Sequence, residues 1–373
     1  MRLLCAALFC IGTTTAQVFV VDVNNGPGTD YTSIATAVAA VPDGAVLQVR
    51  PGTYSPFRIQ NKSLSVFGTT GVIVSNSYFA YPAIEIADLA SDRFVSLREV
   101  SWTGNAGPLG FALKCRNSTG TIVIERCTGS SLPASDSALI VSSCDRVFVR
   151  DSSIVHTSFV DNAISAYLSN VVMTNCNITT QQGISIRQGG GRVHLANCRI
   201  QGSSQLGLAL AVMSGGELLL HGGTTLSSTV AQPAVAGIGT VTLDPSVTLQ
   251  GLAIPPFDPN LTLVNRTIPP LDASTQALFG TAMATLDVPN GSIGYLCVGF
   301  AGAPSFTAGV VDPIWLAAGY ALHAVGSAPA VTGGYAVPNA PWVLGIQVAW
   351  QGAVLDTATG SIAVSNPSVY VHF

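Results

Sequence analysis

The chain contains 373 residues, of which only 9% are charged, and its formal net charge is -4. Nucleic-acid binding requires a basic face, so this composition argues against a nucleic-acid partner. The length is sufficient for two domains. The 38 glycines and the 48% of apolar residues suit a stack of coils, in which contacts between neighbouring repeats provide the stability.

The first 16 residues are organised like a secretory signal peptide. Arg2 precedes an apolar run over residues 3–11, and small residues end at Ala16, so cleavage is expected before Gln17. A membrane-spanning helix requires about 20 apolar residues, which is more than this run provides. The sequence therefore predicts a secreted, periplasmic or cell-surface protein with no integral membrane segment after cleavage.

Residues 21–68 predict the capped end of a coiled stack. A short helix is expected over residues 33–41, with Thr32 or Ser33 at its start and Pro42 after its end. Its apolar face consists of Ile34, Ala37, Val38 and Val41. Strands are expected over residues 45–50 and 63–68, and a Pro-Gly turn closes the first of them. A helix in this position would cover the exposed edge of the first coil.

The most informative pattern is a short phrase that recurs seven times: apolar, any residue, apolar, two residues, then a small residue or cysteine. Its final positions, which recur every 22–27 residues, are Val100, Cys127, Ser152, Cys176, Cys198, Gly223 and Ser246. A nearly fixed period with strand-like alternation is typical of stacked coils. The pattern predicts an all-β fold, a right-handed parallel β-helix over residues 17–254.

A second strand precedes each main strand of the repeat and suggests a ligand-binding face. Its inward apolar pairs are Ile84/Ile86, Leu113/Cys115, Leu139/Val141, Ile164/Ala166 and Ile184/Ile186. Aligning these pairs places Arg116, Tyr167 and Arg187 in one outward column, with Ser142 between the first two. Aromatic faces stack on sugar rings, and arginine pairs with carboxylates. The column is therefore a candidate site for an acidic extracellular polysaccharide, and ordinary solvated surface is the alternative.

The cysteines of the repeat are expected to fill its interior. Cys127, Cys176 and Cys198 share one column of the aligned repeats. Neighbouring coils lie about 4.8 Å apart, which is close enough for a crosslink between Cys176 and Cys198. Stacked side chains point in parallel, however, so the torsion of a disulfide is hard to reach, and free thiols are predicted. No cysteine and histidine occur at ligand spacing, so no metal or other cofactor is expected.

The periodicity fades after Ser246, where a second domain is predicted. Two proline pairs, at residues 255–256 and 269–270, indicate a linker over residues 255–271. From residue 272 onward, short apolar strands alternate with glycine and proline turns. This pattern predicts a small antiparallel β-sandwich over residues 272–373.

Two segments resemble known families. The stretches Tyr31-Thr-Ser-Ile-Ala-Thr-Ala-Val38 and Pro51-Gly-Thr-Tyr54 are similar to the opening of secreted pectin-lyase-like proteins, and of pectin methylesterases in particular. The resemblance covers residues 21–68 by motif and implies a right-handed parallel β-helix. The phrase at residues 337–351 resembles a C-terminal module of secreted planctomycete-type bacterial proteins. This resemblance spans roughly residues 272–373 and implies no activity.

The catalytic motifs of these relatives have no counterpart in the chain. The Asp-Phe-Ile-Phe-Gly and Gly-Arg-Pro-Trp motifs of pectin methylesterases are missing, as is the Gly-His-Gly of polygalacturonases. Pectate lyases bind calcium, which needs several carboxylates, whereas Glu125, Asp151 and Asp161 are scattered singly. His156 and Asp161 share one turn, which fits a polar loop better than a catalytic pair. Arg150 and Asp151 are adjacent on a strand and should face opposite ways.

We therefore expect no catalytic residues. The leading hypothesis is a non-catalytic protein that binds a glycan or serves as a structural part of the cell envelope. The alternative is a lyase or esterase that acts on an extracellular polysaccharide through a divergent site. An enzyme should gather several titratable groups in one groove, whereas a binding module should show them dispersed.

Overall fold

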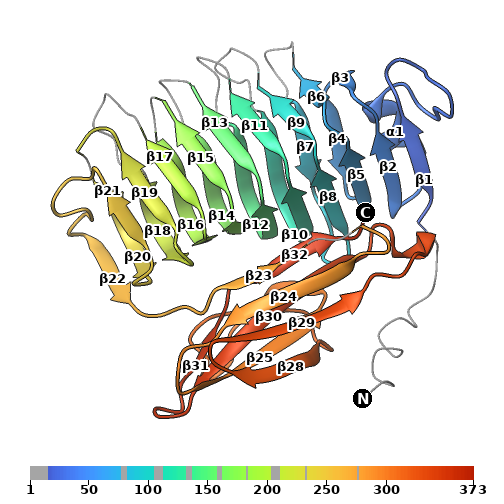
Figure 1. The fold of residues 1–373 in the computed structure, drawn as a ribbon. Coiled ribbons are helices and arrows are strands. Elements are labelled where there is room, and N and C mark those ends of the chain that lie inside the picture. Colours follow the sequence, from blue (N-terminus) through green and yellow to red (C-terminus); the bar gives the residue numbers. More distant parts are fainter. Residues whose placement is uncertain are drawn as a thin grey trace.

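The computed structural model describes residues 16–76, 82–104, 112–131, 137–157, 162–181, 184–202, 211–231, 233–274 and 277–373. Figure 1 shows a long stack of parallel coils followed by an antiparallel domain that lies beneath it. Apart from Ala16, the predicted signal peptide lies outside the described residues. No helix in the described part of the chain is long and apolar enough to cross a membrane.

Two parallel sheets form the β-helix. Within the described residues, the first has 13 strands: β1 (Val18–Val21), β2 (Ala45–Val49), β4 (Phe57–Gln60), β5 (Leu64–Gly68), β7 (Ile84–Ala87), β8 (Phe94–Arg98), β10 (Leu113–Glu125), β12 (Leu139–Arg150), β14 (Asn162–Thr174), β16 (Ile184–Ala196), β18 (Ala211–His221), β20 (Val235–Leu243) and β22 (Leu261–Asn265). The second, counted over the same residues, has nine: β3 (Gly52–Tyr54), β6 (Val72–Ser75), β9 (Ser101–Thr103), β11 (Thr128–Ser131), β13 (Ser153–His156), β15 (Asn177–Thr180), β17 (Arg199–Gly202), β19 (Thr225–Ser228) and β21 (Thr248–Gln250). Every pairing in both sheets joins a strand to its equivalent in a neighbouring coil, which confirms the predicted parallel β-helix.

Each long strand of the first sheet bends near its middle. The bends coincide with residues in the left-handed region, at Asn117, Ser143 and Leu168, with φ of 49°, 53° and 47°. The halves before and after the bend lie on different sides of the coil, and a short strand of the second sheet adds a third side. A coil such as residues 113–131 therefore carries three strand segments.

The interior of the coils is built from the repeated phrase. Ile124, Val149, Met173 and Leu195 are register partners on consecutive coils, and all are buried. Cys127, Cys176 and Cys198 are buried in the same interior and are free thiols in this structure. Burial raises the pKa of the Cys127 thiol to about 12, which keeps it protonated and unreactive. The predicted interior position of these three cysteines is thus confirmed.

The predicted cap is also present. Helix α1 (Ile34–Ala40) begins after Ser33, whose hydroxyl accepts a hydrogen bond from the Thr36 N–H at 3.5 Å. Ser33 rather than Thr32 is therefore the capping residue. The buried residues Ile34, Ala37 and Val38 face the first coils.

The β-helix extends further than the sequence suggested. Strand β22 lies inside the stretch that was expected to be a linker, and it pairs in parallel with β20. The proline pairs at residues 255–256 and 269–270 therefore flank a final coil segment. Only residues 266–270 connect β22 to the first strand of the next domain.

The C-terminal domain is an antiparallel β-sandwich, as predicted. One sheet contains β23 (Leu271–Ala273), β24 (Thr281–Asp287) and β29 (Ala330–Ala336). The other contains β25 (Ser292–Gly299), β28 (Ala321–Ser327), β30 (Gln347–Asp356), β31 (Ile362–Val364) and β32 (Ser368–Val371). A hairpin of β26 (Ala301–Ser305) and β27 (Ile314–Leu316) and a short 3-10 helix, η2 (Pro341–Val343), complete it. Its core includes Leu286, Leu296, Trp350 and Tyr370.

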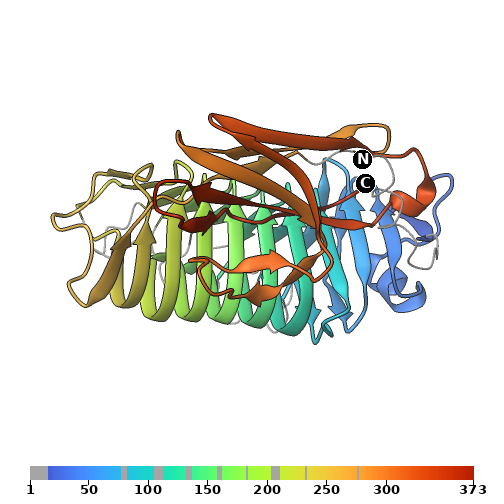
Figure 2. The same cartoon turned by 90° about the horizontal axis from the view of Figure 1, so that it is seen from below.

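The sandwich lies lengthwise against the outer face of the first sheet (Figure 2). Apolar side chains that point out of the coils, including Val123, Phe148 and Val172, are buried against it. The Phe148 ring meets Trp315 of the hairpin edge-on, with ring centroids 5.6 Å apart. This shared apolar layer joins the two domains into one body.

Candidate functional site

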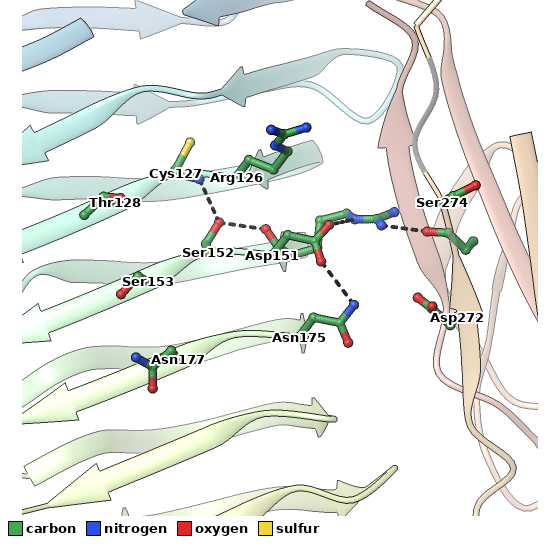
Figure 3. Close-up of a pocket in the computed structure, with 12 residues that line it drawn as sticks. Arg126, Cys127, Thr128, Asp151, Ser152, Ser153, Asn175, Asn177, Asp272 and Ser274 are labelled. Atoms are coloured by element: carbon green, nitrogen blue, oxygen red, sulfur yellow. Dashed lines mark hydrogen bonds and ion pairs between the residues drawn. The ribbon is translucent and has the colours of Figure 1, made fainter. Parts of the chain in front are cut away.

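A groove lies where the coils turn from the first sheet into the second, next to the start of the sandwich (Figure 3). It encloses about 730 Å³. Three consecutive coils line it on one side and residues 272–274, within and just after β23, line it on the other. The lining residues are Arg126, Cys127, Thr128, Arg150, Asp151, Ser152, Ser153, Asn175, Asn177, Asp272, Ala273 and Ser274.

One edge of the groove is a ladder of turn residues. Arg126, Asp151, Asn175 and Asn197 occupy the same turn on four coils, each in the left-handed region with φ between 49° and 56°. Aspartate and asparagine tolerate this conformation better than most residues. Asn197 Nδ2 donates to Asn175 Oδ1 at 2.8 Å, and Asn175 Nδ2 donates to Asp151 Oδ1 at 3.1 Å. The ladder therefore holds its polar groups in register along the stack.

Arg150 connects this ladder to the sandwich. Its Nε donates to Asp151 Oδ2 at 3.0 Å. Its terminal nitrogens donate to the Ala273 carbonyl at 2.6 Å and to Ser368 Oγ at 3.2 Å. The expectation that Arg150 and Asp151 face opposite ways is wrong, because Asp151 leaves the strand in a left-handed turn, where the alternation of side chains ends.

A second hollow of about 390 Å³ continues the groove along the stack. It shares Asn175 and Asn177 with the first and adds Asn197, Arg199 and Gln201. With coils about 4.8 Å apart, four coils give a polar track roughly 14 Å long. Asn177 and Arg199 are exposed, and neither side chain contacts another described residue through a hydrogen bond or ion pair.

Several titratable groups meet in the groove. Arg126, Arg150, Asp151 and Asp272 all line it, and Figure 3 shows the Asp272 carboxylate pointing toward the coils. Both oxygens of Asp151 accept hydrogen bonds within the protein, whereas Asp272 is exposed. No group of three or more His, Cys, Asp or Glu residues in the described ranges could hold a metal ion. The groove can thus offer hydrogen bonds and charge to a ligand.

The predicted column of Arg116, Tyr167 and Arg187 is only partly correct. Arg116 is in register with Ser142, and Ser142 with Tyr167, as expected. Tyr167, however, is opposite Gly189, and Arg187 is opposite Ser165. Arg187 therefore lies two residues away from the column.

The error comes from the inward pair that was assigned to β16. Ile186, rather than Ile184, is opposite Ile164, so Gln188 takes the inward position opposite Ala166. Gln188 is accepted there because its amide donates to the carbonyls of Gly191 and Glu217 at 3.0 and 2.9 Å. A polar residue at an inward position made the apolar pattern misleading.

The remaining members of the column are also less available than expected. The Arg116 Nε donates to Glu85 Oε1 at 2.6 Å, and its Nη1 lies 3.7 Å from Asp88. The Glu85 partner raises the pKa of Arg116 further. Tyr167 is 36% exposed, and Arg187 lies diagonally across from it on the next coil rather than directly opposite. The groove, which the sequence did not indicate, is the better candidate site.

The other residues that were considered for catalysis are not in the groove. His156 is buried, and its Nδ1 hydrogen-bonds to Ser131 Oγ on the adjacent coil. Asp161 lies outside the described residues. Glu125 is buried beneath the sandwich and pairs with Arg98 at 2.9 Å, which makes it a structural residue.

Comparison with known proteins yields similarity in structure alone. No family model and no curated protein matches the chain. A pectin methylesterase from Aspergillus niger matches with a TM-score of 0.40 and 13% identity over 69% of this chain and 87% of that one. ORF18 of Geobacillus virus E2 matches with a TM-score of 0.39 and 12% identity over 91% and 72%. The enzymatically active domain of tailspike protein 4 from bacteriophage CBA120 has a TM-score of 0.28 and 10% identity over 88% and 64%.

At these identities the likeness concerns the fold and carries no activity to this chain. The parallel β-helix rests on the strand register described above. The resemblance of residues 337–351 to a planctomycete-type module stays a prediction.

Proposed function

We propose that the protein is exported and binds an extracellular polysaccharide in the groove, without catalysis, as a glycan-binding or structural component of the cell envelope. The observation that supports this proposal is the polar track on four consecutive coils, next to the wall at residues 272–274. The track repeats at the spacing of the coils, so it presents similar groups again and again to a linear ligand.

The chemistry of the lining suits hydroxyl groups. Asparagine and glutamine amides both donate and accept hydrogen bonds, and serine and threonine hydroxyls do the same. Each hydrogen bond contributes about 0.5–1.5 kcal/mol net, so several must form together for useful affinity. No aromatic residue is among the 12 that line the main groove, so stacking does not add to binding there. We therefore expect modest affinity that depends on ligand length.

The proposal is tested by measuring retention of the mature protein in gels that contain single polysaccharides, neutral and acidic. The Asn177→Ala/Arg199→Ala variant removes two exposed groove side chains that form no hydrogen bond or ion pair with another described residue. We expect this variant to lose about 1.4–3 kcal/mol of binding free energy, which corresponds to roughly 10–100-fold weaker binding. Arg187→Ala is the matched control, since Arg187 is an exposed arginine outside the groove. Equal retention of the groove variant and the control, or no retention of the unaltered protein by any glycan, would contradict the proposal.

One observation favours an enzyme as the second candidate. Asp151, Asp272, Arg126 and Arg150 gather in one groove, and such clusters are common at active sites. In this reading Asp272, the exposed carboxylate, is the acid or base of a lyase or esterase. Assays for new reducing ends, unsaturated products and released methanol distinguish the candidates. Turnover that disappears in Asp272→Asn would establish the enzyme and overturn the non-catalytic proposal.

A further inference from the structure

Two buried histidines meet on the outer face of the first sheet, close to where the chain passes into the sandwich. His194 on β16 and His221 on β18 have their Nε2 atoms 2.6 Å apart and their ring centroids 4.7 Å apart. Both side chains are buried. The two Nδ1 atoms have no hydrogen-bond partner among the described residues.

This contact tolerates only some protonation states. A hydrogen bond between two Nε2 atoms needs one proton on one of them and a lone pair on the other. When both rings carry a second proton, two N–H groups point at each other at a distance that no hydrogen bond can bridge. The doubly protonated pair must therefore separate.

The surroundings of the pair hold the connection between the domains. Asp244 Oδ2 accepts the Ile268 N–H at 2.7 Å, and Pro270 lies against Gly222, next to His221. Arg266 forms a two-pronged ion pair with Asp312 of the sandwich. Residues 266–270 thus bind the last coils on one side and the sandwich on the other.

The charged groups around the pair oppose its protonation. Arg192 and Arg266 are the nearby cations, and each is paired, with Glu217 and Asp312 respectively. Burial, followed by the neighbouring His221 charge and by Arg192 and Arg266, holds the pKa of His194 well below its usual range. Burial lowers the pKa of His221 to about 4, although Asp244 partly offsets this and Arg266 adds to it.

We propose that the His194–His221 pair is an acid-sensitive contact that keeps residues 266–270 docked on the β-helix, and that its protonation releases this connection and widens the groove. The consequence for the groove follows from chain order, because its wall, residues 272–274, comes directly after the connection. The proposal holds whether or not the groove binds a glycan.

The direction of the pH dependence follows from linkage. Both histidines bind protons more weakly when docked than when exposed to water, so the docked state is fully favoured above about pH 6.5. It loses that advantage as the pH falls from 6.5 toward 4, the pKa of His221. At about pH 4.5 the lowered pKa of His221 alone should weaken the docking equilibrium, relative to neutral pH, by on the order of 10–100-fold.

Hydrogen exchange of the full mature chain tests this inference. Exchange of residues 192–202, 211–222 and 262–274, corrected for the intrinsic rate at each pH, should rise roughly tenfold or more between neutral pH and about pH 4.5. Residues 45–66, at the other end of the stack, serve as the internal reference. In His194→Gln/His221→Gln the rise should be less than about twofold, while His323→Gln, a histidine of the sandwich, should behave like the unaltered protein.

An equal rise in the double variant, or no rise in the unaltered protein, would overturn the proposal. If the double variant does not fold, the imidazole resonances of the unaltered protein decide the matter. One coupled titration displaced below the ordinary histidine range supports the contact. Two independent titrations near pH 6.5 would eliminate it.

Discussion

The buried ion pairs beneath the sandwich allow a sharp test of what holds the two domains together. Arg98, Glu125 and Arg150 are register partners on consecutive coils. Glu125 is 0% exposed and Arg98 is 2% exposed. Arg98 Nη1 lies 2.9 Å from Glu125 Oε1, and Arg150 Nε lies 3.8 Å from the same oxygen. The Arg98 guanidinium also stacks on the ring of Phe373, 3.4 Å from its centroid.

Glu125→Leu would leave two buried arginines without this counterion. Removing one partner of a buried ion pair costs about 3–5 kcal/mol. In this variant Arg150 retains its ion pair with Asp151 at 3.0 Å, and Arg98 retains its ion pair with Glu99 at 3.6 Å. We therefore expect the free energy of unfolding to fall by the lower end of this range, about 3 kcal/mol. Adding Arg98→Met removes the stranded charge, and an apolar pair often replaces a buried ion pair without loss. The double variant should therefore be more stable than Glu125→Leu alone by about 2 kcal/mol.

Urea unfolding, followed by tryptophan fluorescence and by circular dichroism, measures these differences. Two probes are needed because proteins of two domains do not always unfold in one step. Glu85→Leu is the control, since it breaks the more exposed pairs with Arg58 and Arg116, each of which should contribute at most about 1 kcal/mol. The reasoning is refuted if Glu125→Leu costs no more than the control, or if Arg98→Met destabilises the double variant further.

Three further outcomes are expected. Phe148→Ala should lower the free energy of unfolding by about 3–5 kcal/mol, because the ring is buried against Trp315; a loss below about 1 kcal/mol in urea unfolding would contradict this packing. Mass spectrometry of the denatured, unreduced protein should find Cys176 and Cys198 as thiols that a maleimide labels only after unfolding, and a crosslink between them in most molecules would count against the prediction. The intact mass of the protein exported by its host should correspond to a chain that begins at Gln17, whereas a mass that includes residues 1–16 would rule out the predicted cleavage.

The β-helix could be predicted because one physical rule repeats in every coil. Alternation of side chains places Ile124, Val149 and Met173 inward whenever their strands are in register, and the period of the phrase sets that register. The rule failed at β16, where Gln188 rather than an apolar residue is inward. Its amide satisfies two carbonyls, which a pattern of apolar residues does not reveal.

The groove could not be predicted from the sequence because it forms between segments that are far apart in the chain. Asp272 meets Asp151 and Asn175 only when the sandwich docks. The contact between Arg150 and Asp151 also depends on a left-handed turn, with φ of 49° at Asp151, and not on strand geometry. The burial of Glu125 likewise results from the sandwich, since its position on the strand is an outward one.

The lengthwise contact of the sandwich constrains how many coils the β-helix can have. It touches Val46 near one end of the stack and, through Phe306, Arg192 far along it. In a free solenoid the loss of one repeat simply shortens the stack. Here the loss of a coil between these points would shift one end by about 4.8 Å against a rigid partner. We expect evolution to change the number of coils in this stretch only together with the length of the sandwich.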